Sequence, residues 1–156
     1  MNSPKLSSLK FRCVDKADDD ITIGEECTRL IHFEILGTLE KKVQIHAPNI
    51  KYIKLEGLKI YEQLVISAMS GYTLFLSNTV IHLEKCPGIS TLVIEYNWSS
   101  ETEKMTATLD QDNYYPLLER VVCRNLQQYS NRFFQAFSFS APRLTELYIQ
   151  FADLRL

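Results

Sequence analysis

The sequence is short of several features that would mark particular protein classes. Its four cysteines in 156 residues are too few for a small domain held together by disulfides. Its 17 basic and 19 acidic side chains give a net charge of −2, which removes the electrostatic case for nucleic-acid or anionic-membrane binding. No apolar stretch reaches the ~18–20 residues that span a bilayer, and the amino terminus lacks the apolar run of a signal peptide. We therefore expect an intracellular protein, cytoplasmic or nuclear, with reduced thiols and neither a membrane nor a nucleic-acid partner.

The cysteine, histidine and acidic residues that could bind a metal or act in catalysis also lack the spacing that such sites require. No Cys-x-x-Cys and no His-x-x-x-His pair occurs among Cys13, Cys27, Cys86, Cys123, His32, His46 and His82. The segment 15–20 with Glu25 and Glu26 is acidic, but it lacks the calcium-loop pattern and is expected to be a solvated connection. Phosphate-binding glycine motifs and nucleophile elbows are absent as well. We predict no enzyme activity, no cofactor and no metal site, with a spatial Cys–His pair as the alternative that sequence leaves open.

What the sequence does contain is an internal repeat marked by its five prolines. Calling each proline position zero, apolar residues follow at offsets +2, +5 and +7 in every case. Thr28 and Met69 open two further phrases of the same kind, although Gly71 misses the +2 offset. The seven repeats therefore start near residues 4, 28, 48, 69, 87, 116 and 142.

The offsets have a direct physical meaning. Apolar residues two apart are typical of a strand with one buried face, and the +2 residue enters from the preceding bend. Small residues precede five of the starts and suit inward corners: Cys27, Ala47, Ala68, Cys86 and Ala141. Because one such unit cannot bury its own apolar face, the units must stack into a solenoid. An antiparallel sandwich is the alternative, but its strands usually recur every ~8–12 residues, which is closer than here.

Two phrases resemble the leucine-rich-repeat region of F-box proteins, particularly the plant FBD-like type. They are residues 43–55, which include Ile45-His-Ala-Pro-Asn-Ile50, and residues 137–149, which include Phe139-Ser-Ala-Pro-Arg-Leu144. The resemblance implies an α/β leucine-rich-repeat horseshoe with a parallel sheet on the concave face and few, short helices. It implies one domain over residues 1–156 with about seven irregular repeats, and we expect a fragment of a longer solenoid. The usual asparagine at offset +10 occurs only as Asn97, and no F-box precedes the first repeat.

Two segments interrupt the repeats. Trp98 to Asp112 is polar and rich in Ser and Thr, and is expected to project as a mobile loop. Leu126 to Phe137 could form one short helix, with Phe133 and Phe137 on one side. Both segments are expected to lie away from the predicted sheet.

Outward side chains at offsets +4, +6 and +8 define the predicted binding face. The +6 positions of the last four repeats form an apolar stripe, and arginine and glutamate flank it, a composition typical of protein interfaces. The candidate residues are Tyr52, Phe75, Val93, Glu95, Arg120, Val122, Arg124 and Tyr148. Phe75→Glu or Val122→Glu is expected to abolish partner capture while the fold survives. The alternatives are ordinary exposed strand residues, or a patch covered by a missing cap or partner domain.

The expected function follows from the fold and the resemblance. We expect a protein–protein interaction module, and the resemblance implies substrate recognition for an SCF-type ubiquitin ligase, whose components would be reached through a missing F-box. The alternative is a leucine-rich scaffold or immune-sensor module. A parallel β-helix carbohydrate-active enzyme, which would carry a carboxylate cluster on one sheet face, is a further alternative.

Overall fold

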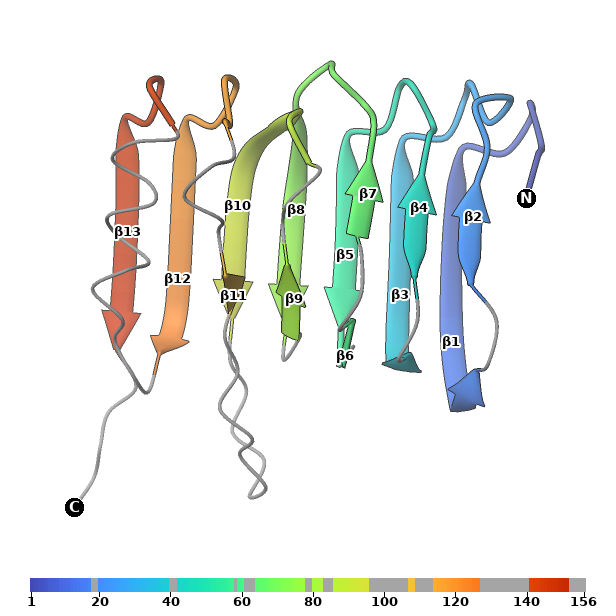
Figure 1. The fold of residues 1–156 in the computed structure, drawn as a ribbon, viewed down its shortest axis with the longest axis horizontal. Coiled ribbons are helices and arrows are strands. Elements are labelled where there is room, and N and C mark those ends of the chain that lie inside the picture. Colours follow the sequence, from blue (N-terminus) through green and yellow to red (C-terminus); the bar gives the residue numbers. More distant parts are fainter. Residues whose placement is uncertain are drawn as a thin grey trace.

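The computed structural model describes residues 1–17, 20–39, 42–57, 59–60, 64–77, 80–82, 86–95, 107–108, 114–126 and 141–151. These residues form three parallel β-sheets and contain no helix. The long sheet has the order β1 (Ser8–Ala17), β3 (His32–Leu39), β5 (Tyr52–Glu56), β8 (Tyr72–Ser77), β10 (Ile89–Glu95), β12 (Arg120–Leu126) and β13 (Glu146–Phe151). Figure 1 shows these seven strands side by side along the longest axis, from the amino-terminal end to the carboxy-terminal end.

Two smaller sheets complete the architecture. One has the order β2 (Ile21–Ile23), β4 (Val43–Ile45) and β7 (Leu64–Ile66). The other has the order β11 (Ala107–Thr108), β9 (Val80–His82) and β6 (Lys59–Ile60). Between neighbouring strands of the long sheet, from β1 to β12, the chain passes through one or both small sheets and then returns in the same direction. This is a solenoid, and we call each passage from one long-sheet strand to the next a coil.

The pairing register of the long sheet brings equivalent repeat positions into columns. The +4 residues are successive Cα partners, in the order Ser8, His32, Tyr52, Thr73, Thr91, Arg120 and Glu146. The unit opened by Met69 joins this register through β8, which pairs with both β5 and β10. A one-residue slip in any coil would turn its apolar side chains outward, so the apolar pattern specifies the register.

The core lies behind the long sheet and contains the +5 and +7 side chains. In the inner coils these residues are fully buried, as for Phe33, Ile53 and Leu74. Burial of alternate residues confirms the predicted inward face, because successive side chains of a strand point to opposite sides.

The small residues before the repeat starts lie at buried corners. Those five are all buried: Cys27, Ala47, Ala68, Cys86 and Ala141. At one corner the backbones of two coils come very close, since a Cβ atom added to Gly88 would fall on the carbonyl oxygen of Ala68. The predicted requirement for small corner residues is thus confirmed.

The predicted fold class is confirmed as a parallel-sheet solenoid, but its helical part is not found among the described residues. The strands β2, β4 and β7 stand opposite the long sheet. Val43 and Ile45 in β4, and Leu64 and Ile66 in β7, alternate with half-buried residues, a period of two that favours strands over helices.

The two interrupting segments fall largely outside the described residues. Within the predicted loop, residues 107–108 form β11 and pair with β9, so that part of the expectation is wrong. Trp98 lies outside the described residues. Residue 126 is the last residue of β12, and the rest of the predicted helix, residues 127–137, also lies outside them.

Candidate functional site

The long sheet presents its +4, +6 and +8 side chains away from the core, and we call this surface the outward face. Its +6 column runs through all seven strands, in the order Lys10, Glu34, Lys54, Phe75, Val93, Val122 and Tyr148. The column is charged over the first three strands and apolar or aromatic over the last four. The outward face therefore has two chemically different halves.

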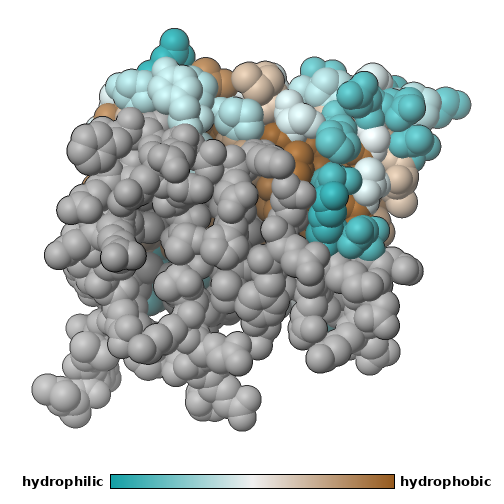
Figure 2. Space-filling model, viewed as in Figure 1, coloured by the Kyte–Doolittle hydropathy of each residue, from teal (hydrophilic) through white to brown (hydrophobic). Residues whose placement is uncertain are grey.

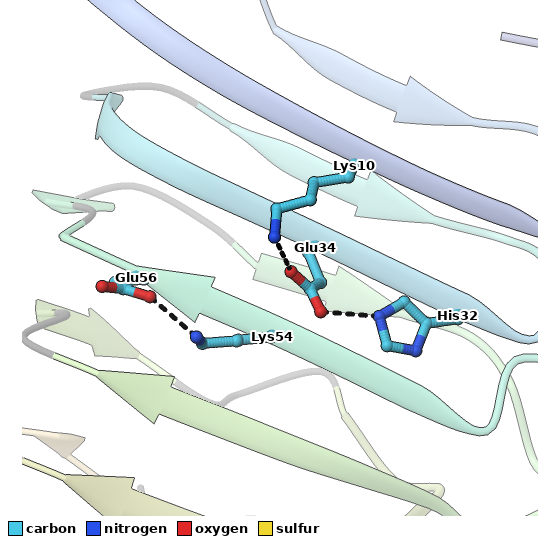
Figure 3. Close-up of polar contacts among 5 residues, drawn as sticks. All are labelled: Lys10, His32, Glu34, Lys54 and Glu56. Carbon is cyan, nitrogen blue, oxygen red and sulfur yellow. Dashed lines mark hydrogen bonds and ion pairs between the residues drawn. The ribbon is translucent and has the colours of Figure 1, made fainter.

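In the charged half, one carboxylate is held by two basic side chains. Glu34 accepts from Lys10 Nζ at 2.9 Å and contacts His32 Nε2 at 2.7 Å. Figure 3 shows the Glu34 carboxylate lying between these two side chains, which come from neighbouring strands. The His32 ring also stacks on Tyr52 of the next strand, with 4.8 Å between ring centroids. Predicted residue Tyr52 is thus part of a fixed polar cluster.

Lys54 connects the charged half to the apolar half. Its Nζ lies 2.8 Å from Glu56 Oε2 and 5.5 Å from the ring centroid of Phe75 on the next strand. The second contact is a cation–π interaction. The hydrogen bond to Glu56 raises the pKa of Lys54 above its usual value.

A titration prediction follows from Glu34. Hydrogen bonds from Lys10 and His32 lower the pKa of Glu34 below its usual 4.5, so its ionised form stabilises the fold. That contribution is complete above the unfolded pKa and is lost as the pH falls through the folded value. Glu34→Gln is therefore expected to lower the thermal unfolding midpoint at pH 7, and to lower it by less at pH 3.

The control is Glu25→Gln, at an exposed glutamate beyond β2, which is expected to change neither midpoint. Equal losses for Glu34→Gln at both pH values would show that the ion pairs do not stabilise the fold.

In the apolar half, the predicted residues differ in exposure. Phe75 and Val93 are partly exposed, and Tyr148 is 49% exposed. Val122, which lies between Val93 and Tyr148 in the pairing register, is only 4% exposed. The expectation that Val122 belongs to an open surface is wrong, and Val122→Glu would disturb packing as well as any contact with a partner.

Two ion pairs flank the apolar residues. Arg120 Nε lies 3.0 Å from Glu146 Oε1, across β12 and β13, and Arg124 Nη1 lies 3.6 Å from Glu95 Oε2, across β12 and β10. These are the arginine and glutamate residues predicted to flank the stripe. Because each of these charged side chains already has a partner, they would orient a bound molecule more than they would attract a ligand of one charge.

The thiols are placed as core residues. Cys27, Cys86 and Cys123 are buried, and burial raises the pKa of Cys123 to about 12. Among the described residues, no group of three His, Cys, Asp or Glu side chains is placed to hold a metal ion. Nothing is described of the Cys13 side chain.

The Lys10–His32–Glu34 cluster was not among the predicted site residues. The signal for it was present, because Lys10, Glu34 and Lys54 alternate in charge at the same offset of adjacent repeats. Opposite charges directly across neighbouring strands attract each other, so this column predicts ion pairs between strands. The Lys10–Glu34 pair forms in this way, whereas Lys54 pairs with Glu56 of its own strand.

No family model, curated protein or solved structure matches the chain. In the part of the chain that the structure describes, no helix has the length and apolar character needed to cross a membrane.

Proposed function

We propose that the protein is a protein-recognition module that binds its partner on the outward face, in a solenoid of the leucine-rich-repeat type. The observation that carries this proposal is the set of partly exposed apolar side chains on the outward face beside paired charges. Phe75 and Val93 are neighbours across β8 and β10, and Tyr148 is exposed on β13, beyond the buried Val122. An apolar centre with a polar rim is the usual composition of a protein interface.

The finer proposal is that the fold is an α/β leucine-rich-repeat horseshoe and that the partner is a ubiquitin-ligase substrate. It rests on the resemblance of residues 43–55 and 137–149 to F-box proteins. The coil lengths of about 18–29 residues are compatible with that repeat class. A leucine-rich scaffold or immune-sensor module would use the same face, and would differ in the proteins captured with it.

A parallel β-helix enzyme is the second candidate, because three parallel sheets are also the architecture of that class. Such an enzyme would carry carboxylates free to act on a glycosidic bond. The outward glutamates that the structure describes each lie within 3.6 Å of a basic partner: Glu34, Glu56, Glu95 and Glu146. Ion-paired carboxylates support recognition over hydrolysis.

The test compares two valines on opposite sides of the solenoid. Val93 and Val65 are both half-buried, but Val93 lies on the outward face and Val65 lies on β7 of a small sheet. Val93→Glu is expected to lower capture of the specific partners from a cell extract at least tenfold, because it puts a charge into the apolar centre. Val65→Glu is expected to leave capture unchanged.

Circular dichroism on both variants verifies the fold, and mass spectrometry identifies the captured proteins. Adaptor and cullin subunits among them would support the ubiquitin-ligase proposal. Unchanged capture by folded Val93→Glu would refute binding on the outward face.

A further inference from the structure

The corner between β7 and β8 differs from the other corners of the solenoid. In the other six repeats, the N–H at offset +2 donates to the carbonyl oxygen just before the repeat start, as Ile50 N does to Ala47 O. In the repeat that starts at Met69 the equivalent atoms are Gly71 N and Ala68 O, and no hydrogen bond joins these two described residues. Gly71 has a φ of 74°, so the backbone turns by a different route there.

This corner also has a backbone donor that most of the other corners lack. Five repeats start with proline, which has no N–H group, whereas this one starts with Met69. Neither Ala68 N nor Met69 N donates a hydrogen bond to any residue that the structure describes. Ala68 is buried and Met69 is 60% exposed. An unpaired N–H in a buried residue costs free energy unless another group accepts from it, so the corner is suited to an incoming acceptor.

A serine and a histidine meet directly before this corner. Ser67 Oγ lies 2.7 Å from His46 Nδ1. The backbone holds the two residues side by side on neighbouring coils, because His46 N donates to Ile23 O at 2.9 Å and Ser67 N donates to Ile45 O at 3.0 Å. Ser67 Oγ also lies 3.5 Å from Ile45 O, but its contact with the imidazole is the shorter one. Ser67 is exposed and His46 is half-buried, so an outside molecule can reach the serine.

We propose that Ser67 is a nucleophile activated by His46, and that it accepts acyl groups from small esters. When the imidazole carries its proton on Nε2, its Nδ1 accepts the hydroxyl proton as Ser67 Oγ attacks the ester carbonyl carbon. The N–H groups of Ala68 and Met69 are the donors for the negative charge that develops on the carbonyl oxygen. The N–H of the residue after a nucleophilic serine commonly has this role.

Each bond and proton of the transfer is accounted for by the ester, Ser67, His46 and water. The bond between Ser67 Oγ and the acyl carbon forms, and the bond from that carbon to the alcohol oxygen breaks. The protonated His46 gives its proton to the departing alcohol oxygen. Water then attacks the acyl-serine with His46 as base, which releases a carboxylic acid and restores the hydroxyl group. The pair follows β4 and β7 of a small sheet, so this activity does not depend on binding at the outward face.

A fluorophosphonate probe tests whether Ser67 is a nucleophile. Attack of a serine oxygen on the phosphorus displaces fluoride and leaves a stable covalent label. The folded wild-type chain is expected to carry the label on Ser67, located by mass spectrometry of its peptides, and Ser67→Ala is expected to lose it. Ser70→Ala is the matched control and is expected to react like the wild type. Ser70 is an exposed serine of the same corner whose Oγ donates to Pro48 O at 3.4 Å.

His46→Gln separates activation of the serine from a purely structural hydrogen bond. Glutamine can still hydrogen-bond to Ser67, but it cannot act as a base, so the urea unfolding midpoint is expected to stay close to that of the wild type. The rates of labelling and of nitrophenol release from p-nitrophenyl acetate are expected to fall about 100-fold. A wild-type chain without label at Ser67, nitrophenol release no faster than by Ser67→Ala, or unchanged rates in folded His46→Gln would each overturn the proposal.

Discussion

Phe33→Ala is expected to lower the free energy of unfolding by about 3–5 kcal/mol, the usual cost of removing a large aromatic side chain from a core. Phe33 is fully buried in β3, and its ring packs edge-on against Phe11 of β1, with 6.0 Å between centroids. The surrounding coils are held by continuous sheets and cannot collapse into the space left behind. Urea unfolding followed by circular dichroism measures the loss.

Phe75→Ala is the matched comparison, because the same substitution is made on the other side of the same sheet. Phe75 is partly exposed on the outward face and contacts Lys54. Its loss is expected to cost less than half as much as the loss of Phe33, since less apolar surface returns to water. Similar costs for both substitutions would mean that the inward and outward faces are assigned wrongly.

Gly88→Ala is expected to destabilise the fold by about 3 kcal/mol, at the upper part of the range for overpacked interiors. The added Cβ would meet the carbonyl oxygen of Ala68 and would lie 3.0 Å from Tyr72 Cε1. The Ala68 carbonyl is backbone of the preceding coil, and Gly88 O accepts a hydrogen bond from Tyr72 N at 3.1 Å. Two coils must therefore separate to admit one methyl group.

Gly24→Ala is its control, because the atoms nearest to a Cβ there belong to the exposed side chains of Asn2 and Glu26. Those groups can move into solvent, and the expected cost is about 0.5 kcal/mol or less. The urea unfolding midpoints of the two variants measure how much stability each substitution removes. A cost for Gly88→Ala no greater than that of Gly24→Ala would contradict the close contact between coils.

The sheet could be predicted from the sequence because its signal is repeated. Each repeat restates the +5 and +7 apolar offsets, and parallel pairing of equivalent positions is the arrangement that buries all of them in one core. Even the unit that starts at Met69, where Gly71 replaces an apolar residue, takes its place as β8 between β5 and β10. Small corner residues such as Ala47 and Ala68 were predicted for the same reason.

The side of the solenoid opposite the long sheet could not be predicted in the same way. Its strands are only two or three residues long, as in Val43–Ile45 and Leu64–Ile66, and so short an apolar alternation does not distinguish a strand from a helix. The resemblance implied few, short helices, and the described residues contain none. These segments are strands because each pairs with the equivalent strand of a neighbouring coil.

The sequence also could not predict how exposed each side chain of the outward face is. Offset +6 predicts the direction of a side chain but not how closely its neighbours approach, and Val122 is buried where Val93 is not. The Lys10–Glu34 ion pair could be predicted from the sequence only once the strand register was known. Pairing across strands converts such a column into contacts.

Site-specific photo-cross-linking tests most directly whether the outward face contacts a partner protein. A photoreactive side chain is placed at Val93 in one variant and at Val65 in another, and each is irradiated in a cell extract. Our account predicts that position 93 cross-links to a discrete partner, that excess unlabelled wild-type chain competes for it, and that position 65 does not. Cross-linking of that partner from position 65 alone, or equally from both, would contradict the account.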